Sequence, residues 1–300
     1  MRHVLTAVAM IALSGAAQAQ DAQVINPRAL FPEGPLMSDG KLYYAEYAGH
    51  VVSMWDGKNN SQLWKQDGCG PAAVVPLGDN FGITCYDSGQ LVVISKDGKT
   101  VKSYDKDDAG AALVGPNDGT PDGQGGAYFT LSGPWEAAAI VGRVVRLSAD
   151  GKLTEAANDL HYANGIARGA DGRLYVNESE AGRVISFAVG GDGGLTDRRL
   201  FVRLYQLGEG PEAYPDGIKL GPNGNFYVGE YFGVGSVEQT GANDILEITP
   251  DGKIANKYSV PSKTSPNMTF SDDGKTMYVM AVDNTAGAPY EGKVYAVPVK

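Results

Sequence analysis

One short unit recurs along this chain at a fixed internal spacing. It begins, in all copies but one, with a polar residue and reaches an aromatic or aliphatic residue eleven positions later. The pairs with that spacing are Ala72 and Ile83, Asn117 and Tyr128, Asn164 and Tyr175, Asp216 and Tyr227, and Asn267 and Tyr278, while Glu33 precedes Tyr43 by ten. Copies therefore begin near residues 33, 72, 117, 164, 216 and 267, which limits the fold to architectures built from equivalent units.

Turn signals divide each copy into short strands. A Gly-(Arg/Lys)-Val strand recurs at 142–144, 182–184 and 292–294, and Asp-Gly turns recur at 97–98, 150–151 and 251–252. The 41 glycines and 16 prolines suit many turns between short strands. Each copy is interpreted as four strands, so the chain is predicted to be all-β, a six-bladed β-propeller with four-stranded blades. A pair of β-sandwiches would not require this register, and a β-helix has shorter coils.

The first nineteen residues are predicted to be a cleaved signal peptide. Arg2 precedes a mostly apolar run over residues 4–13, and small residues stand at Ala17 and Ala19, which predicts cleavage after Ala19. A buried N-terminal helix is the alternative interpretation. The apolar run is too short to span a membrane. We therefore expect residues 20–300 to form a single propeller domain that is exported, periplasmic or secreted, and not bound to a membrane.

The charge balance limits the partners. A formal net charge of −10 argues against nucleic acids and anionic membranes, and it suits cations or neutral substrates. Nothing in the sequence argues for a dimer, so a monomer is expected. Cys69 and Cys85 lie sixteen positions apart. Export permits a disulfide between them, and two free thiols are the alternative.

The repeat also predicts a site, because equivalent positions of successive blades lie on a circle around the propeller axis. Glu33, Asn117, Asn164, Asp216 and Asn267 occupy the same position in their copies and are expected to reach one mouth of the channel. Oxygen ligands without histidine or cysteine favour a hard divalent cation: Ca²⁺ first, with Mg²⁺ or Mn²⁺ compatible and Zn²⁺ less suited. Asn and Asp before glycine are also ordinary turn residues, but a turn requirement alone does not account for Glu33.

These motifs resemble those of the senescence marker protein (regucalcin), gluconolactonase and luciferin-regenerating enzyme family of six-bladed propellers. The resemblance covers the chain after the signal peptide and rests on Glu-Gly-Pro at 33–35, Asn-Asp-Gly at 117–119, Ala-Asn-Gly-Ile-Ala at 163–167, Pro-Asp-Gly-Ile at 215–218 and Pro-Asn-Met-Thr-Phe at 266–270. It implies one divalent cation on the axis, held by Glu33, Asn164 and Asp216. Asn117 matches a residue that contacts the cation or its bound water and substrate, and in the related drug-responsive lactonases and paraoxonases that position is itself a ligand.

The chemistry that the resemblance implies is hydrolysis of a small or sugar lactone, in which the cation polarises the ring carbonyl and water attacks it. Asp216 is the family's usual candidate for the base. Asp118 is a second candidate, with the role of a turn acid as its alternative. Asn267 is not a ligand that the family predicts, and we retain it as a substrate contact. His161 is a further candidate substrate contact, with a surface or half-buried imidazole as the alternative.

Two departures from the family pattern concern the substrate. Sugar-lactonase members often carry an arginine two residues before the Asn117 position, where this chain has Gly115. The paraoxonases use a histidine in blade two, where this chain has Ala72. A non-enzymatic propeller that binds a ligand or partner, with Ca²⁺ as a structural pin, is the alternative function. A lyase acting on macrocyclic lactones is another, and it would require an axial histidine, for which His161 is the candidate.

Overall fold

The computed structural model describes residues 22–134, 140–210, 213–231, 244–283 and 290–300. They form β-strands and three short 3-10 helices, η1 (Tyr47–Gly49), η2 (Ser179–Ala181) and η3 (Leu204–Leu207). The prediction of an all-β chain is therefore confirmed. None of the helices in these ranges is long and apolar enough to cross a membrane. The predicted signal peptide lies outside the described residues.

Four of the sheets contain four strands each, and the strands of each sheet are consecutive in the chain and paired in order. The first is formed by β2 (Pro32–Ser38), β3 (Lys41–Glu46), β4 (Val51–Trp55) and β5 (Asn60–Lys65). The second is formed by β6 (Pro71–Leu77), β7 (Asn80–Cys85), β8 (Gln90–Ser95) and β9 (Thr100–Tyr104). The third is formed by β10 (Pro116–Pro121), β11 (Ala127–Leu131), β12 (Gly142–Leu147) and β13 (Leu153–Leu160). The fourth is formed by β14 (Ala163–Arg168), β15 (Leu174–Glu178), β16 (Arg183–Val189) and β17 (Leu195–Arg203).

The remaining strands form one eight-stranded sheet. Its first half is formed by β18 (Tyr214–Leu220), β19 (Phe226–Tyr231), β20 (Asp244–Ile248) and β21 (Ile254–Ser259). Its second half is formed by β22 (Thr264–Phe270), β23 (Thr276–Val282), β24 (Gly292–Pro298) and β1 (Gln23–Ala29). The halves join through the pairing of Glu230 with Ser265. The sheets are thus blade-like and four-stranded in most of the chain, while the count of six separate blades stays a prediction.

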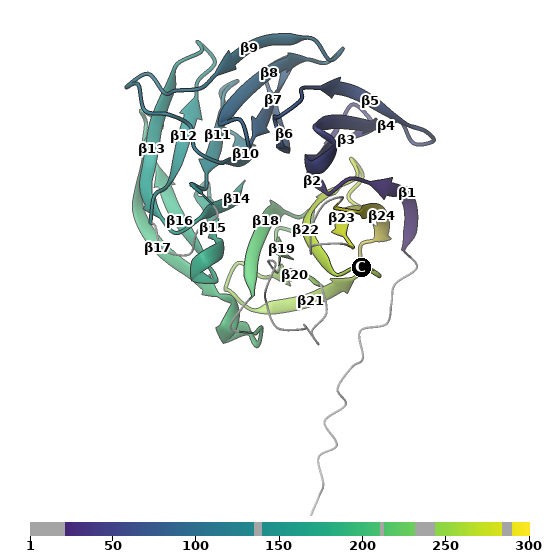
Figure 1. The fold of residues 1–300 in the computed structure, drawn as a ribbon. Coiled ribbons are helices and arrows are strands. Elements are labelled where there is room, and N and C mark those ends of the chain that lie inside the picture. The colour runs from purple at the N-terminus through teal and green to yellow at the C-terminus, as the bar shows by residue number, and fades with distance from the viewer. Residues whose placement is uncertain (1–21, 135–139, 211–212, 232–243, 284–289) are drawn as a thin grey trace, which may run out of the picture.

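The first strand of each repeat lies nearest the centre of the molecule (Figure 1). Contacts run from β2 to β6, then to β10, β14, β18 and β22, and from β22 back to β2. β1 pairs with β24, so the start of the described chain lies beside its end. The six predicted copies therefore begin on strands that surround one axis. Cys69, which precedes β6, and Cys85, the last residue of β7, form a disulfide, which decides between the two interpretations of that pair.

The core is divided among clusters that each lie between neighbouring sheets or half-sheets. Alternate residues of one strand enter different clusters, as the two-residue period of a strand requires. On β11, Phe129 packs toward the preceding sheet with Val75, while Tyr128 packs toward the following one with Ile166. Because both faces are covered, the strand is buried along its whole length with Thr130 as its one polar residue, and the aromatic residues of the repeat are core residues.

The inner strands approach one another most closely at the repeated motif. The β-ladder of every inner strand shifts register there, for example between Ala163 and Ile166 on β14 and between Pro215 and Ile218 on β18. The glycine between these positions allows the next strand to come near. A Cβ placed on Gly165 would lie 2.3 Å from the carbonyl oxygen of Asp216. Glycine is therefore required at this position by contact with the neighbouring strand.

We expect Gly165→Ala to destabilise the protein by about 1–3 kcal/mol, because the methyl group meets backbone that cannot rotate away. Gly191→Ala is the control, since nothing lies within 4 Å of a Cβ at that position. Urea denaturation would compare the free energies of unfolding. Equal stability of the two variants would contradict the close approach of the strands.

Glu230 on β19 is a buried carboxyl group outside the central channel. Both of its oxygens are buried without a hydrogen-bond partner among the described residues. Burial raises its pKa from 4.5 to about 9, with Glu209 adding to the effect and Lys257 opposing it. The folded protein therefore holds this proton at neutral pH.

This proton makes stability depend on pH. The unfolded chain releases it above pH 4.5 and the folded protein keeps it to about pH 9. The free energy of unfolding should therefore fall as pH rises through this range, by up to about 1.4 kcal/mol per pH unit. Glu230→Gln should reduce the slope of this dependence in urea denaturation across the range. The exposed Glu291→Gln should leave it unchanged, and an unaltered slope in Glu230→Gln would refute the assignment.

Candidate functional site

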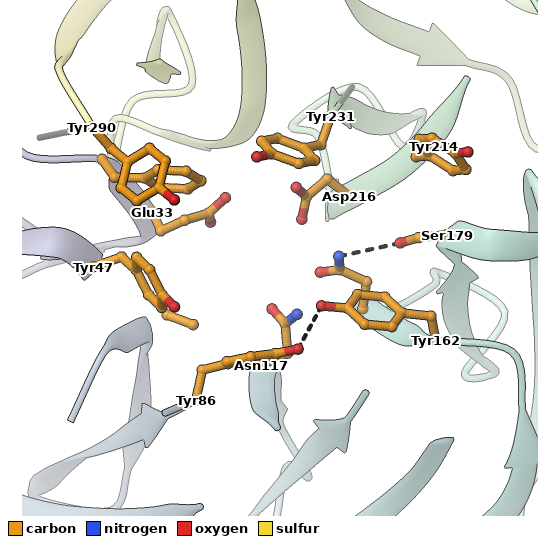
Figure 2. Close-up of a pocket in the computed structure, with 13 residues that line it drawn as sticks. Glu33, Tyr47, Tyr86, Asn117, Tyr162, Ser179, Tyr214, Asp216, Tyr231 and Tyr290 are labelled. Atoms are coloured by element: carbon orange, nitrogen blue, oxygen red, sulfur yellow. Dashed lines mark hydrogen bonds between the residues drawn. The ribbon is translucent and has the colours of Figure 1, made fainter. Parts of the chain in front are cut away.

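A cavity of about 340 Å³ opens at the centre of the ring of inner strands. Its lining comes from residues far apart in the sequence: Phe31, Glu33, Tyr47, Ala72, Tyr86, Asn117, Tyr162, Asn164, Ser179, Tyr214, Asp216, Tyr231 and Tyr290. Figure 2 shows the carboxylate groups of Glu33 and Asp216 and the amide of Asn117 directed into one space between aromatic rings. The cavity is thus polar at its base and aromatic around its walls.

Glu33, Asn117, Asn164 and Asp216 all line this cavity, so the structure brings the predicted ligand residues together. Each lies on the inner strand of its copy at the point where the pairing register shifts: on β2, β10, β14 and β18 respectively. A bulge of this kind redirects a side chain out of the regular alternation of the strand. The repeated motif therefore aims four oxygen-bearing side chains at the axis.

The two carboxyl groups are buried close to each other. Glu33 Oε2 accepts hydrogen bonds from the Gly34 backbone N–H (2.7 Å) and from Asn267 Nδ2 (3.1 Å). Burial, and to a smaller extent the negative charge of Asp118, raises the pKa of Glu33 to about 8. Burial and then the neighbouring Glu33 raise the pKa of Asp216 well above its ordinary value. Two such groups at one site favour a proton or a cation between them.

The two amides are oriented by serines in an equivalent way. Asn117 Nδ2 donates to Ser132 Oγ (3.0 Å), and Asn164 Nδ2 donates to Ser179 Oγ (3.2 Å). In each amide group the NH2 end is therefore engaged in a hydrogen bond with a protein side chain. Asn164 Oδ1 is buried and has no hydrogen-bond partner in the described part of the chain. A buried acceptor without a partner costs free energy, so this oxygen is suited to a ligand.

Each serine also binds the next inner strand. Ser132 Oγ donates to the carbonyl oxygen of Ala163 (2.6 Å), the residue before Asn164. Ser179 Oγ donates to the carbonyl oxygen of Pro215 (2.7 Å), the residue before Asp216. The side chain that orients one amide thus also fixes the backbone from which the next oxygen donor extends.

The other three predicted site residues are not among the residues that line the cavity. Asn267 lies behind Glu33 and donates to it, so its observed contact is with a carboxylate. Asp118 is buried, accepts from the Gly119 N–H and forms an ion pair with Lys219 (3.2 Å). His161 is half-buried, and its backbone N–H donates to Glu178 Oε1 (2.8 Å).

The side chains at the base of the cavity fit a hard cation. Among the described residues, no group of three or more His, Cys, Asp or Glu side chains could hold a metal ion. A cation here would therefore depend on amide oxygens as well as on the two carboxylates. Glu33, Asp216, Asn117 and Asn164 together offer only oxygen donors, and Asn164 Oδ1 is an unsatisfied one. This donor set suits Ca²⁺, Mg²⁺ or Mn²⁺ better than metals that prefer nitrogen and sulfur.

The aromatic wall was not predicted from the sequence. The ring of Phe31 lies 5.4 Å from that of Tyr47, 6.0 Å from that of Tyr231 and 5.6 Å from that of Tyr290, between centroids. The rings of Tyr47 and Tyr86 are 6.4 Å apart. These spacings are typical of interacting aromatic side chains. The rings therefore form a connected wall above the polar base.

Part of this wall sits on a backbone conformation that suits glycine. Phe31 and Tyr162 have φ angles of 55° and 57°, and the equivalent positions in two other copies are Gly70 and Gly115, at 57° and 61°. A residue with a Cβ costs roughly 1–2 kcal/mol in this left-handed region. Two copies thus retain a bulky ring at a position where glycine would be unstrained, as residues at functional sites often do.

Simple sequence signals would have found these residues. An aromatic residue stands two positions before the site residue in three copies, as Phe31, Tyr162 and Tyr214. A serine stands fifteen positions after the asparagine in two copies, as Ser132 and Ser179. Both offsets follow from the repeat, so the same register that locates the oxygen donors also locates their aromatic and serine neighbours.

Comparison with known proteins identifies a family and a common fold. The model of the family described as SMP-30/Gluconolactonase/LRE-like region matches residues 31–283. No curated protein matches the sequence.

Three solved structures are similar to the chain at identities that support the fold alone. A gluconolactonase from Xanthomonas campestris is 20% identical, with a TM-score of 0.73, and the match covers 98% of this chain and 94% of that one. A calcium-binding regucalcin from Agrobacterium tumefaciens is 16% identical, with a TM-score of 0.71 and 93% of each chain covered. A luciferin-regenerating enzyme is 17% identical, with a TM-score of 0.73 and coverages of 93% and 95%.

The serine contacts lead to a prediction about stability. Ser179→Ala removes a buried partner from both Asn164 and the Pro215 carbonyl, so the free energy of unfolding should fall by about 1–3 kcal/mol. Ser88→Ala, the same change at an exposed serine, should alter it by less than about 0.5 kcal/mol. Chemical denaturation measures both values. A Ser179 variant as stable as the Ser88 variant would show that the serine does not hold the asparagine.

Proposed function

Because the chain belongs to the SMP-30/gluconolactonase/LRE-like family, we propose that it is a divalent-cation-dependent lactonase that hydrolyses a small lactone to the hydroxy acid. One observation carries the proposal: Glu33, Asp216, Asn117 and Asn164 converge on one cavity with a buried, unsatisfied amide oxygen among them. A scaffold without a ligand would have no need for two buried carboxyl groups at this depth. The six inner strands that surround this cavity also support our proposal that the fold is a six-bladed propeller.

The residues of the cavity would have the following roles in the reaction. Glu33, Asp216 and Asn164 hold the cation, with Asn117 as a fourth donor or as a contact to substrate. A bound divalent cation supplies polarisation of the ring carbonyl. The deprotonated Asp216 carboxylate accepts a proton from the attacking water. Oxygen from water then joins the carbonyl carbon, the ring C–O bond breaks, and Asp216 returns the proton to the ring oxygen, which becomes the hydroxyl of the hydroxy acid.

The structure favours Asp216 over Asp118 for the proton transfer. Asp216 lines the cavity, whereas the Asp118 carboxylate is bonded to Lys219 and to the Gly119 N–H. We assign Asp118 and Lys219 to the floor below the site, where their opposite charges offset each other. Asn267 then positions Glu33 through its 3.1 Å hydrogen bond.

We also propose that the protein is exported and acts as a monomer in the periplasm or outside the cell. The expected cleavage site after Ala19 supports export. The disulfide between Cys69 and Cys85 supports it as well, because such bonds persist in oxidising compartments.

The decisive experiment combines cation binding with activity. The chelator-treated chain would be titrated with Ca²⁺, Mn²⁺ and Zn²⁺ by calorimetry and assayed on γ- and δ-lactones with each cation. We expect Ca²⁺ to bind and to restore hydrolysis. Glu33→Gln and Asp216→Asn should weaken Ca²⁺ binding by at least about 100-fold, more than the loss of an outer-shell partner typically costs.

Asp118→Asn is the matched control. Asp118 is also a buried acid on an inner strand, but its carboxylate forms an ion pair with Lys219 and does not line the cavity. This substitution should weaken Ca²⁺ binding far less than the other two substitutions. A wild-type protein that hydrolyses none of the lactones with any cation would overturn the enzymatic proposal. Equal Ca²⁺ affinities in all three variants would overturn the cation site.

A further inference from the structure

The walls of the cavity offer aromatic surface, and tyrosine hydroxyls are the polar groups that its rings carry. Phe31 and six tyrosines surround the base, and among the described lining residues there is no lysine, arginine or histidine. The polar side chains at the base are the four oxygen donors and Ser179, which already binds Asn164 and Pro215. A substrate group that extends from the base toward the opening therefore meets ring faces.

Several of the tyrosine hydroxyls are already engaged by protein groups. Tyr47 donates to Asp87 Oδ1 (2.6 Å), and the hydroxyls of Tyr86 and Tyr162 lie 2.8 Å apart. Tyr86 also lies within hydrogen-bond distance of the Gly133 carbonyl oxygen (3.3 Å). A polyhydroxylated ligand would meet, on this side of the cavity, three hydroxyls that already form hydrogen bonds with protein groups. Each hydroxyl without a partner would weaken binding.

The backbone also excludes a long polar side chain at position 115. Gly115 has a φ of 61°, and a Cβ there would lie 2.5 Å from the Gly133 carbonyl oxygen and 3.0 Å from the ring of Tyr86. Position 115 is the equivalent of Phe31 and Tyr162 in its copy. In five of the six copies this position therefore carries a ring or a glycine that lies beside a neighbouring ring, and in the sixth it is the buried Ser265.

The outer end of the third sheet continues this apolar character. Val114 precedes β10 and is 48% exposed, and Val141 precedes β12 and is 50% exposed. β10 starts with the segment that carries Asn117, so Val114 lies at the end of the sheet on which the cavity opens. Val141 lies beside Gly133, whose carbonyl oxygen is 3.3 Å from the Tyr86 hydroxyl, so an exposed apolar side chain stands near that ring.

From these features we infer that the substrate is a lactone with an unhydroxylated, preferably aromatic, substituent, and that polyhydroxylated sugar lactones are poor substrates. That the substrate is a lactone rests on the proposed function. The preference for an aromatic substituent rests on the aromatic walls of the cavity. Flat rings gain both apolar burial and edge or face contacts with Phe31 and the tyrosines. The four oxygen donors at the base take the ester group.

Three δ-lactones with the same ring size test the inference with the cation-loaded protein: δ-valerolactone, δ-phenyl-δ-valerolactone and glucono-δ-lactone. We expect kcat/KM for the phenyl compound to exceed that for δ-valerolactone by about tenfold to a hundredfold. Glucono-δ-lactone should not exceed δ-valerolactone. A higher kcat/KM for glucono-δ-lactone than for the phenyl compound would overturn the inference and leave the lactonase proposal standing.

A pair of substitutions at Tyr47 separates the ring from its hydroxyl. Tyr47→Phe keeps the ring and should keep the phenyl preference within about threefold, while Tyr47→Ala should lose most of it. Circular dichroism and thermal denaturation would verify that both variants are folded. Equal preferences in the two variants and the wild type would show that the ring does not select the substrate.

Binding of lactams resolves the case in which no lactone is hydrolysed. δ-Valerolactam, δ-phenyl-δ-valerolactam and gluconolactam match the three lactones in shape and resist hydrolysis. Calorimetry with the cation-loaded protein should show at least about tenfold tighter binding of the phenyl lactam than of the other two. If no lactone is hydrolysed but the phenyl lactam still binds more tightly, only the proposed function is refuted. If the phenyl lactam does not bind more tightly than the other two, the inference is refuted.

Discussion

The close approach of the inner strands around the axis is the constraint on which the rest of the structure depends. A Cβ on Gly34 would lie 2.1 Å from Ala73 Cα, and one on Gly217 would lie 2.3 Å from Asn267 Cγ. Strands can come this near only where a side chain is missing, so glycine recurs beside the site residues. The same bulge that brings the strands together turns Glu33 and Asp216 toward the axis. Fold and site therefore share one requirement on the sequence.

Hydrogen bonds from the second, third and fourth sheets also fix the inner strand of the next sheet. Thr84 Oγ1 donates to the Asn117 carbonyl oxygen (2.5 Å), and Asn177 Nδ2 donates to the Asp216 carbonyl oxygen (2.6 Å). With the contacts of Ser132 and Ser179, each site residue between β10 and β18 is held by the preceding sheet as well as by its own. The direction of each oxygen donor is thus a property of the ring, and no single sheet could set it.

Most of the fold and the four oxygen donors of the site could be predicted from the sequence, whereas the aromatic wall was not predicted. The repeat located the inner strands, and its register brought Glu33 and Asp216 to one cavity, because a periodic fold places equivalent positions at equivalent depth. The register does not give the direction of a side chain. Asn267 shares the position of the oxygen donors, yet it bonds to Glu33 and does not line the cavity. His161, chosen because it is near Asn164, does not line it either, because it lies in the connection between β13 and β14 and proximity in sequence does not fix the direction of a side chain.

The pairing of β1 with β24 bears on how the molecule is made. These strands join residues 23–29 to residues 292–298, so their contact closes one of the longest loops that the chain can form. During synthesis, Glu33 is available long before the strands that complete its surroundings, and Asn267 and then Tyr290 are made last among the residues at the site. A chain that stopped short of β24 would leave β1 and β23 as open sheet edges that can pair with other chains. The surroundings of the cavity are therefore complete only once β24 has been made, and a chain that ends before it exposes sheet edges that favour aggregation.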